Sequence, residues 1–444
     1  MDVVAAGTLA LLSLLWSLLA IIHSPELSRL DEWTYLDYAW KVSAGHIPVA
    51  GEPVAREILV AWSCRGMDGT IQGVTLPTCS VANGADVSAW PYKGQNYNAF
   101  HPPVYFLLMG LFARAVSVSG MSFVTGARLF CGLVVAVSLS ALYFAIRRWR
   151  VGRVAAFSAT LLTLATPGVA ASAAIAHSES INVLAGACAV WLGARIVVDR
   201  NFGWKVPAIV AVAVASMRVI STVGLLALAL AEILFAIFPR ISGMAVSRIE
   251  RRRLAGIGIA IVAGVMATYL AWALWQGIRT PASYVPATKG VSTSEFGNSD
   301  IGRVLGTLIS AYGLSQYPQD WYMQLSLNST VLVAWSTALY CFYLALPWVA
   351  LAVSFKERTK RTLAASAAAG PLVTGVVVQA REIVTNASFF RNISGRYALS
   401  ALPLFAASAA FVCDRKWMRS GLCVFASLGY AIVMISPLLA DLPS

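Results

Sequence analysis

Two adjacent carboxylates, Asp31 and Glu32, follow directly on the first apolar segment of the chain. They lie in the stretch SRLDEWTYLDYAW (28–40), which is rich in tryptophan and tyrosine. Aromatic neighbours would partly desolvate a carboxylate and anchor the segment at a membrane interface, so one acid could act as general base on a hydroxyl nucleophile. An acidic pair at a helix start can also simply complement the helix dipole, and the local sequence favours neither interpretation.

A second polar stretch, NAFHPPVYFLL (98–108), contains a tandem proline that predicts a sharp helix start. His101 and Tyr105 are its candidate substrate-binding residues. The alternative is a stiff turn with an aromatic anchor.

A third stretch, IAHSESIN (175–182), carries polar residues in strongly apolar surroundings. Polar residues at membrane depth are costly and usually face a cavity or a site, so His177 and Glu179 are candidate substrate-binding residues. A helix cap formed by Ser178 is the structural alternative.

Arginines gather late in the chain, in REIVTNASFFRNISGRY (381–397). Arg391 and Arg396 could bind a phosphate at headgroup level, because guanidinium groups make paired, charge-assisted hydrogen bonds to phosphate oxygens. Snorkelling to ordinary lipid headgroups is the alternative. The remaining candidates are Arg218 and Lys289 for phosphate and Tyr397 for substrate.

Of the seven cysteines, Cys64 and Cys79 alone fall in the first long loop, where an external compartment permits a disulfide; two free thiols are the alternative. Neither HExxH nor a paired CxxC occurs, so the sequence gives no sign of a metal site. We expect no required cofactor, with a divalent cation held by carboxylates as the open alternative.

The composition defines the broad class. The 444 residues are 58% hydrophobic and only 12% charged, with a mean hydropathy of +0.72, and apolar runs long enough to cross about 30 Å of hydrocarbon recur along the chain. The net charge of +13 is concentrated in short loops, which is the positive-inside pattern rather than a nucleic-acid surface. We therefore expect an all-α polytopic membrane protein and reject a nucleic-acid partner.

We expect about eleven transmembrane helices in one domain, 1–444. They cover about 3–22, 125–146, 154–172, 179–197, two short spans within 206–238 that turn at SMRVIST, 254–275, 328–354, 362–380, 396–413 and 420–440. The external loops are then 23–122, with juxtamembrane helices, 277–325 and 381–395. Residues 103–118 are interpreted as an amphipathic helix on the outer membrane surface, because a true span there would put the basic loop RRWRVGR outside.

Three motifs in this order resemble the GT-C glycosyltransferase superfamily: DE at 31–32, HPPVYFLL at 101–108 and GRYALSALPLF at 395–405. The chain is similar in outline to protein mannosyltransferases and to the aminoarabinose transferase of lipid A. One departure is Ser400, which stands where a proline is common in such motifs.

The resemblance implies a bundle of spans with its site at the outer membrane surface and a polyprenyl-phosphate-linked sugar as donor. It implies inversion at the anomeric carbon, with Asp31 as general base, Glu32 assisting or binding the acceptor, and Arg396 holding the donor phosphate. The acceptor would be a glycan, a lipid or a surface protein, and the sugar stays open. The expected location is a bacterial cytoplasmic membrane, with the site facing the periplasm or exterior.

Two other functions stay open at this stage. A transporter or flippase of lipid-linked sugars would predict inverted repeats and helices broken at mid-membrane, and we find no repeat in the sequence. A polymerase or ligase of lipid-linked glycans would share the external loops and arginines but would transfer a whole oligosaccharide.

Overall fold

The computed structural model shows a chain that is 76% helical. It describes residues 1–28, 31–67, 71, 73–239, 247–285, 293–297, 300–314, 330–354 and 360–439. Within these ranges, nine helical segments are long and apolar enough to cross a membrane. The fold is consistent with an all-α, multi-pass membrane protein, as the composition predicted.

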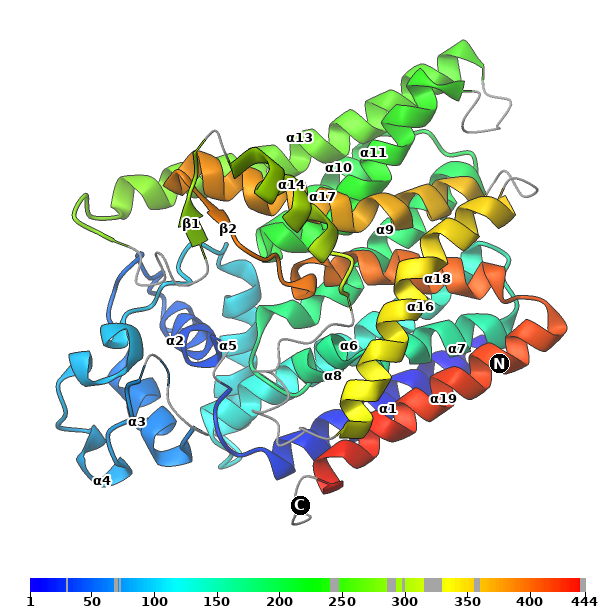
Figure 1. Cartoon of the computed structure of the whole chain (residues 1–444). Helices are drawn as coiled ribbons and strands as arrows, with labels where there is room; N and C mark the ends of the chain where they lie inside the picture. The colour runs from blue at the N-terminus through cyan, green and yellow to red at the C-terminus, as the bar shows by residue number, and fades with distance from the viewer. Residues whose placement is uncertain are drawn as a thin grey trace.

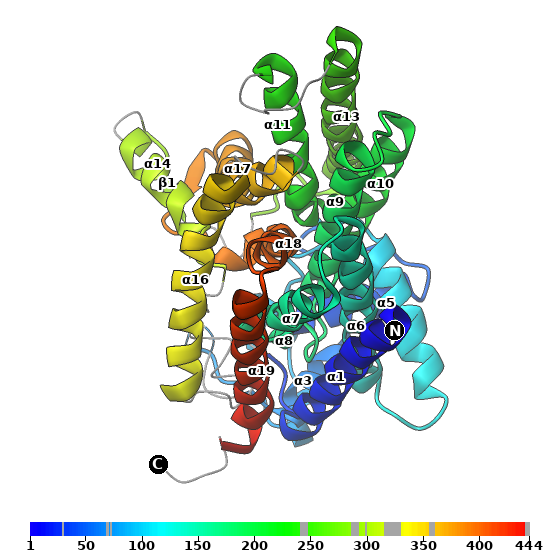
Figure 2. The same cartoon turned by 90° about the vertical axis from the view of Figure 1, so that its right-hand side faces the viewer.

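The long apolar helices pack into one bundle (Figure 1). Its helices are α1 (Asp2–His23), α6 (Phe123–Arg148), α7 (Arg153–Leu164), α8 (Pro167–Ser172), α9 (Asn182–Val197), α10 (Lys205–Met217), α11 (Val223–Ile237), α13 (Arg248–Arg279), α16 (Thr330–Ser354), α17 (Arg361–Asn386), α18 (Leu402–Val412) and α19 (Lys416–Leu439). Helix α1 packs on α6, α6 on α9, and α11 on both α13 and α17. Helix α18 runs through the middle (Figure 2). Of the residues in Gly395–Val412, which comprises α18 and the turn before it, 89% are buried.

Two of the predicted spans contain only shorter apolar helices, α7 and α10, which do not count among the nine long segments. Helix α7 gives way to α8 at Thr166 and Pro167, where proline takes the first position of the new helix. Helix α10 ends at Met217, and Arg218 adopts an extended conformation with φ −163° and ψ 117° before the chain turns into α11. The predicted break within 206–238 is thereby confirmed.

One end of the bundle, hereafter the basic end, collects the chain start and the loops rich in arginine. Asp2 contacts Arg147 at 3.1 Å and Arg153 at 3.2 Å. The loops themselves are joined by further ion pairs and hydrogen bonds: Arg148 with Asp199, Arg200 with Glu250, and the Gly152 amide with Asp414. The amino terminus and the start of α13 lie toward the right-hand side of Figure 1. The amino terminus therefore lies on the same side as the basic loops.

The opposite end, hereafter the site end, is covered by a layer of short elements. They are α2 (Glu32–Val42), α3 (Arg56–Arg65), α4 (Cys79–Ala82), η1 (Val87–Ala89), η2 (Pro91–Gly94), α5 (Val104–Ser117), α14 (Ile301–Ser310), β1 (Thr293–Glu295) and β2 (Ser388–Phe390). A disulfide between Cys64 and Cys79 joins α3 to α4. The antiparallel pairing of β1 with β2 joins the two later loops, and α17 continues past Arg381 to Asn386 before β2 begins.

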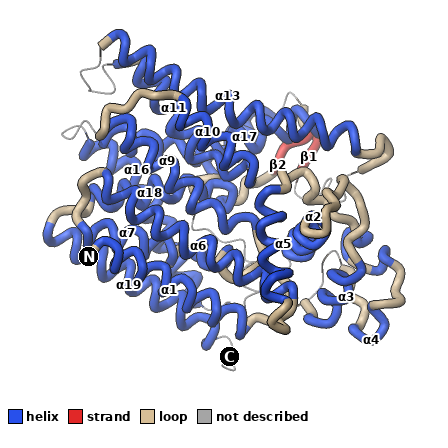
Figure 3. The backbone as a smooth tube through the Cα atoms, turned by 180° about the vertical axis from the view of Figure 1, so that it is seen from behind, coloured by secondary structure: helices blue, strands red, loops and turns tan. Residues whose placement is uncertain are grey.

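Helix α5 is the element predicted over 103–118. It has 14 residues and is about 21 Å long, which is short for a hydrocarbon core of about 30 Å. It packs on α2 and α6, and Figure 3 shows it crossing the direction of the bundle helices. One side is buried through Tyr105, Phe106 and Met109, and the other exposes leucines, so the helix is amphipathic as predicted.

Aromatic residues form the core of the site-end layer. Trp33 stacks on Trp62 with ring centroids 4.4 Å apart, and Tyr38 stacks on Phe106 at 4.3 Å. All four rings are fully buried. The sequence-based expectation that the aromatics around Asp31 anchor the chain at a membrane interface is therefore wrong for Trp33 and Tyr38, because they pack inside the layer instead.

The backbone before α18 fits closely between α9 and α11. A Cβ atom on Gly186 would lie 2.3 Å from the Ser400 carbonyl oxygen, and one on Gly224 would lie 2.4 Å from the same atom. The Ser400 hydroxyl in turn accepts a hydrogen bond from the Gly224 amide at 3.4 Å. Ser400 thus accepts a hydrogen bond from an amide in the first turn of α11, where amides have no partner within the helix.

We expect Gly186→Ala to destabilise the protein by about 1–3 kcal/mol, the usual cost of forcing extra atoms into a packed interior. The new methyl group meets the backbone of residue 400 and the Pro403 ring, neither of which can rotate away. Thermal unfolding in detergent measures the effect. The control is Gly277→Ala in α13, where an added Cβ meets no atom within 4 Å. Equal stability of the two variants would contradict the close packing described above.

Candidate active site

Three helices begin at one place at the site end. Short 3-10 turns, η3 (Ser178–Ile181), η4 (Val219–Thr222) and η7 (Gly395–Ala401), lead into α9, α11 and α18. The turns contact one another or the adjoining helices, and Ser221 Oγ donates to Asn182 Oδ1 at 2.6 Å. The amides of a first helical turn lack partners within their helix and carry partial positive charge. The meeting point therefore favours a negatively charged group.

A buried carboxylate, Glu179 in η3, connects the start of α9 with the starts of α11 and α18. Its Oε1 lies 3.2 Å from Nη2 of Arg218, just before η4, and 3.8 Å from Nε of Arg396, in η7. The Glu179 side chain is 0% exposed, and those of Arg218 and Arg396 are 3% and 15% exposed. A charge buried so deeply requires a partner, so this cluster binds the three turns together.

Arg218 retains unused hydrogen-bonding capacity. Within the described parts of the chain, its Nε and Nη1 have no hydrogen-bond partner, although the residue is 2% exposed. The same is true of the Ser178 hydroxyl and the Asn182 amide nitrogen. Because buried polar groups are normally satisfied, donors left over beside a cluster of helix starts indicate a place for a polar ligand.

Asp31 lies on the open side of this cluster. Its Oδ2 is 3.7 Å from Nη2 of Arg396, and its Oδ1 accepts a hydrogen bond from the Tyr97 hydroxyl at 2.7 Å. Its backbone is left-handed, with φ 63°, a conformation that aspartate and asparagine tolerate better than most residues. The side chain is 20% exposed, whereas that of Glu179 is 0% exposed. Of these two carboxylates, Asp31 is the one that an incoming group can reach.

His101 lies close to this cluster, and its surroundings favour the neutral form of its imidazole. Burial lowers the pKa of its imidazole well below the usual range, and the nearby charges of Arg218, Arg381 and Arg396 lower it further. Its Nε2 lies 3.5 Å from the Tyr35 hydroxyl. The pKa of Tyr35 is raised by burial and by the negative charge of Asp31, so this phenol keeps its proton. Both side chains can orient a ligand, and neither is a cationic group at neutral pH.

The other candidates from the 101–108 and 175–182 stretches act on the shape of the site. The buried Tyr105 hydroxyl lies 2.6 Å from Ser180 Oγ and donates to the His177 carbonyl at 3.2 Å, which joins α5 to η3. His177 Nδ1 accepts a hydrogen bond from the Glu179 amide at 3.1 Å, which leaves the imidazole proton on Nε2. The His177 ring meets Tyr35 edge-on at 4.5 Å. These contacts position Glu179 rather than extend to the open side.

Glu32, expected from the sequence to share the chemistry of Asp31, lies in a separate buried ion pair. Its two oxygens accept from Arg128 Nε at 2.8 Å and Nη2 at 2.9 Å. They also accept hydrogen bonds from the backbone amides of Ala176 at 2.8 Å and Ser28 at 2.6 Å. The Glu32 side chain is 0% exposed and every strong acceptor site is in use. It connects the start of α2 to α6 and to the turn before η3, so it holds Asp31 in place.

The remaining predicted residues are placed differently. Arg391 is exposed and donates to Ser294 Oγ at 2.9 Å and to the Thr293 carbonyl at 3.2 Å, so its bonds are with β1 and not with the cluster. Tyr397 supports Arg396, whose Cζ lies 5.1 Å from the centre of its ring. Lys289 lies outside the described residues. In the part of the chain that the structure describes, no group of three or more histidine, cysteine or acidic residues could hold a metal ion.

Sequence reasoning missed two residues near the site, Tyr97 and Arg128. Tyr97 precedes the NAFHPP stretch by one position, and nothing in its surroundings marked it as the partner of Asp31. Arg128 carried a usable signal, because an arginine inside an apolar span is costly and requires a partner. Arg381, the first arginine of the late arginine-rich stretch in the sequence, lies with Cζ 4.7 Å from the centre of the Phe100 ring, beside His101.

No protein-family model, curated protein or solved structure matches the chain.

We expect Glu32→Gln to destabilise the protein by about 3–5 kcal/mol, because it leaves the Arg128 guanidinium charged and buried without its counter-charge. Chemical or thermal unfolding in detergent measures the loss. The double variant Glu32→Gln with Arg128→Met removes both charges and should recover part of the stability.

The matched control for that cycle is Glu57→Gln, which removes an exposed carboxylate from α3 and should change stability by less than about 0.5 kcal/mol. If Glu32→Gln were as mild as the control, the ion pair would not be the contact that fastens α2 to the bundle.

Proposed function

We propose that the protein is a membrane glycosyltransferase of the GT-C type, which moves a sugar from a polyprenyl-phosphate carrier to an acceptor hydroxyl. The observation that carries the proposal is the pairing of an accessible carboxylate, Asp31, with a cation, Arg396, at the point where three helices begin. A base and an anion-binding group side by side are what such a transfer requires.

The leaving group in this reaction is a lipid phosphate, whose negative charge grows as the bond to the sugar breaks. Arg396 and the unused donors of Arg218 support a phosphate at the cluster, and the starts of α9, α11 and α18 add partial positive charge. Preorganised donors of this kind stabilise developing charge without having to reorient during the reaction.

The attacking hydroxyl must lose its proton as the new bond forms. Tyr97 occupies Oδ1 of Asp31, which leaves Oδ2 to accept that proton. The acceptor oxygen bonds to the anomeric carbon from the face opposite the phosphate, the bond from that carbon to the phosphate oxygen breaks, and its electron pair leaves with the phosphate. Attack from the opposite face inverts the anomeric centre.

Arg396 couples the two halves of the proposed site. Its guanidinium lies 3.7 Å from Asp31 and 3.8 Å from Glu179, too far for strong hydrogen bonds to either. A phosphate would compete for the guanidinium and so release the Asp31 carboxylate from its counter-charge.

The proposed orientation puts the basic end in the cytoplasm and the site at the outer surface of a bacterial cytoplasmic membrane. The gathering of the basic loops and the amino terminus at one end supports this orientation. The polyprenyl chain would lie against apolar helix faces, and the acceptor, a glycan, lipid or surface protein, would approach Asp31 from outside.

We expect Asp31→Asn to lower kcat by about 10²- to 10⁴-fold while donor binding changes little, because asparagine keeps the shape and tolerates the left-handed backbone but takes up no proton. Purified protein is given a panel of synthetic polyprenyl-phosphate pentoses and hexoses with membrane-extracted acceptors. Release of polyprenyl phosphate reports turnover. Glu57→Gln is the control and should keep full turnover.

Full turnover by Asp31→Asn would remove Asp31 as the base. No turnover by the unmodified protein with any monosaccharide donor, but transfer from an oligosaccharide carrier, would instead indicate a glycan ligase or polymerase.

We expect Arg396→Ala to weaken binding of a polyprenyl monophosphate by about 10- to 100-fold, which corresponds to loss of a charged hydrogen bond of about 1.5–3 kcal/mol. Titration calorimetry of the purified protein with this lipid measures the change. Arg391→Ala removes an exposed arginine that is bonded to β1 and should bind as the unmodified protein does. Equal affinity of the two variants would contradict the phosphate assignment.

A further inference from the structure

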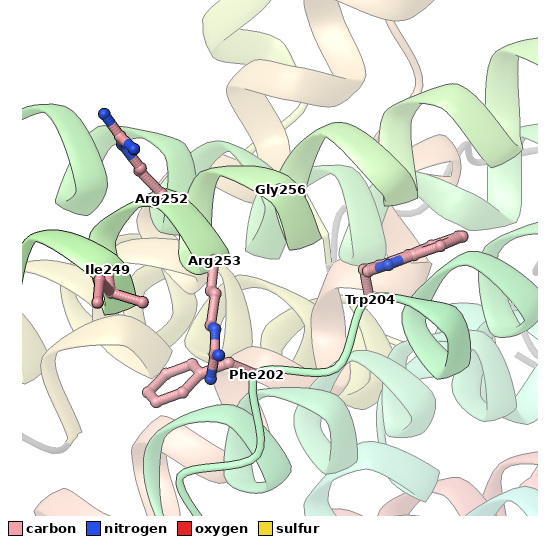
Figure 4. A pocket seen from close by; sticks show the side chains of 6 residues that line it. All are labelled: Phe202, Trp204, Ile249, Arg252, Arg253 and Gly256. Carbon is pink, nitrogen blue, oxygen red and sulfur yellow. The ribbon is translucent and has the colours of Figure 1, made fainter.

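A hollow lies at the basic end, at the opposite end of the bundle from the candidate active site. Its volume is about 350 Å³, and it is lined by Phe202, Trp204, Ile249, Arg252, Arg253 and Gly256. Figure 4 shows Arg253 extending from α13 toward Phe202, with Trp204 beyond Gly256 on the other side. The hollow therefore lies between the segment that leads into α10 and the first turns of α13.

The two arginines of the hollow are charged groups with no counter-charge. Arg252 and Arg253 are exposed, and neither makes a hydrogen bond or ion pair with the described part of the chain. The nearest acid in sequence, Glu250, is already engaged, because it accepts from Arg200 at 2.5 Å and closes a capping box with Ser247. The positive charge of the hollow is thus left for an external anion.

The other walls of the hollow are apolar and accessible. Trp204 is 57% exposed and Ile249 is 65% exposed. Helix α13 has 32 residues and is about 48 Å long, so its ends extend beyond a hydrocarbon core of about 30 Å. Its apolar part begins directly after Arg253, and Trp204 directly precedes the apolar α10. Tryptophan beside arginine at such a boundary is typical of the headgroup level of a membrane.

We propose that this hollow is a binding site for an anionic phospholipid of the membrane leaflet at the basic end. Arg253, which extends toward Phe202, binds the headgroup phosphate, and Arg252, which extends to the other side of α13, adds positive charge beside it. Trp204 and Ile249 contact the glycerol and the first part of the acyl chains. The apolar half of the site favours a lipid over a free phosphate ion, because a phosphate ion has no apolar part to contact Trp204 and Ile249. The ligand class is a phosphodiester lipid with net negative charge, such as phosphatidylglycerol.

The test is native mass spectrometry of the delipidated, purified full chain with phosphatidylglycerol, phosphatidylcholine or inorganic phosphate added. We expect one phosphatidylglycerol to bind preferentially, and Arg252→Ala with Arg253→Ala to weaken that binding by about 30-fold, since each arginine near an anionic surface contributes about a fivefold effect. Arg248→Ala with Arg415→Ala removes two exposed charges from the same end outside the hollow and should leave it unchanged.

A second variant tests the cavity without removing charge. Gly256→Leu projects into the hollow, where an added Cβ meets no atom within 4 Å, and leucine favours the helix. We expect it to weaken phosphatidylglycerol binding as the arginine variant does. Equal binding of phosphatidylglycerol and phosphatidylcholine, competition by inorganic phosphate alone, or unchanged binding by both variants would each overturn the proposal.

Discussion

The buried carboxylate of Glu179 is the constraint on which the site depends. A charge removed from water requires a counter-charge, and Glu179 has two, Arg218 and Arg396, from segments far apart in the chain. Each of these three residues precedes or lies in a 3-10 turn, so satisfying one carboxylate brings three helix starts together. The close glycine contacts at Ser400 then allow the backbones of α9, α11 and the segment before α18 to approach as this ion cluster requires.

The Glu32–Arg128 pair solves a different problem at the same end of the protein. It attaches a layer of short helices, which has its own aromatic core, to the apolar bundle. Because Glu32 also accepts the Ala176 amide, the same carboxylate fixes the start of α2 relative to the turn that carries Glu179. Asp31 is adjacent to Glu32 in sequence, so its distance from Arg396 follows from this attachment. Adjacent acids in one motif thus have separate tasks, one buried and structural, the other exposed to the site.

The sequence was a good guide wherever local chemistry decides the structure. Apolar runs and basic loops predicted most of the bundle, the break at Arg218 and the amphipathic α5, since each follows from the cost of placing polar groups in hydrocarbon. Three features could not be predicted from the sequence. They are the burial of Trp33 and Tyr38, the hydrogen bond from Tyr97 to Asp31, and the pairing of Arg391 with β1. Each depends on contacts between segments distant in sequence. The local sequence around an aromatic residue or an arginine does not indicate whether its side chain faces lipid, protein or ligand.

Arginine illustrates this limit most clearly, because the protein uses it in two opposite ways. At the site end, Arg218 and Arg396 are buried around one shared acid, and their positions are set by that charge and by the helix starts beside it. At the basic end, Asp2, Asp199, Glu250 and Asp414 each already contact an arginine or a loop amide of their own. Arg252 and Arg253 are left over on an exposed surface. With 33 basic and 20 acidic side chains, such a surplus is unavoidable, and the fold concentrates it where solvent or charged headgroups can stabilise it. A guanidinium with a buried acid is held in one geometry, whereas one without an acid remains available to an external anion.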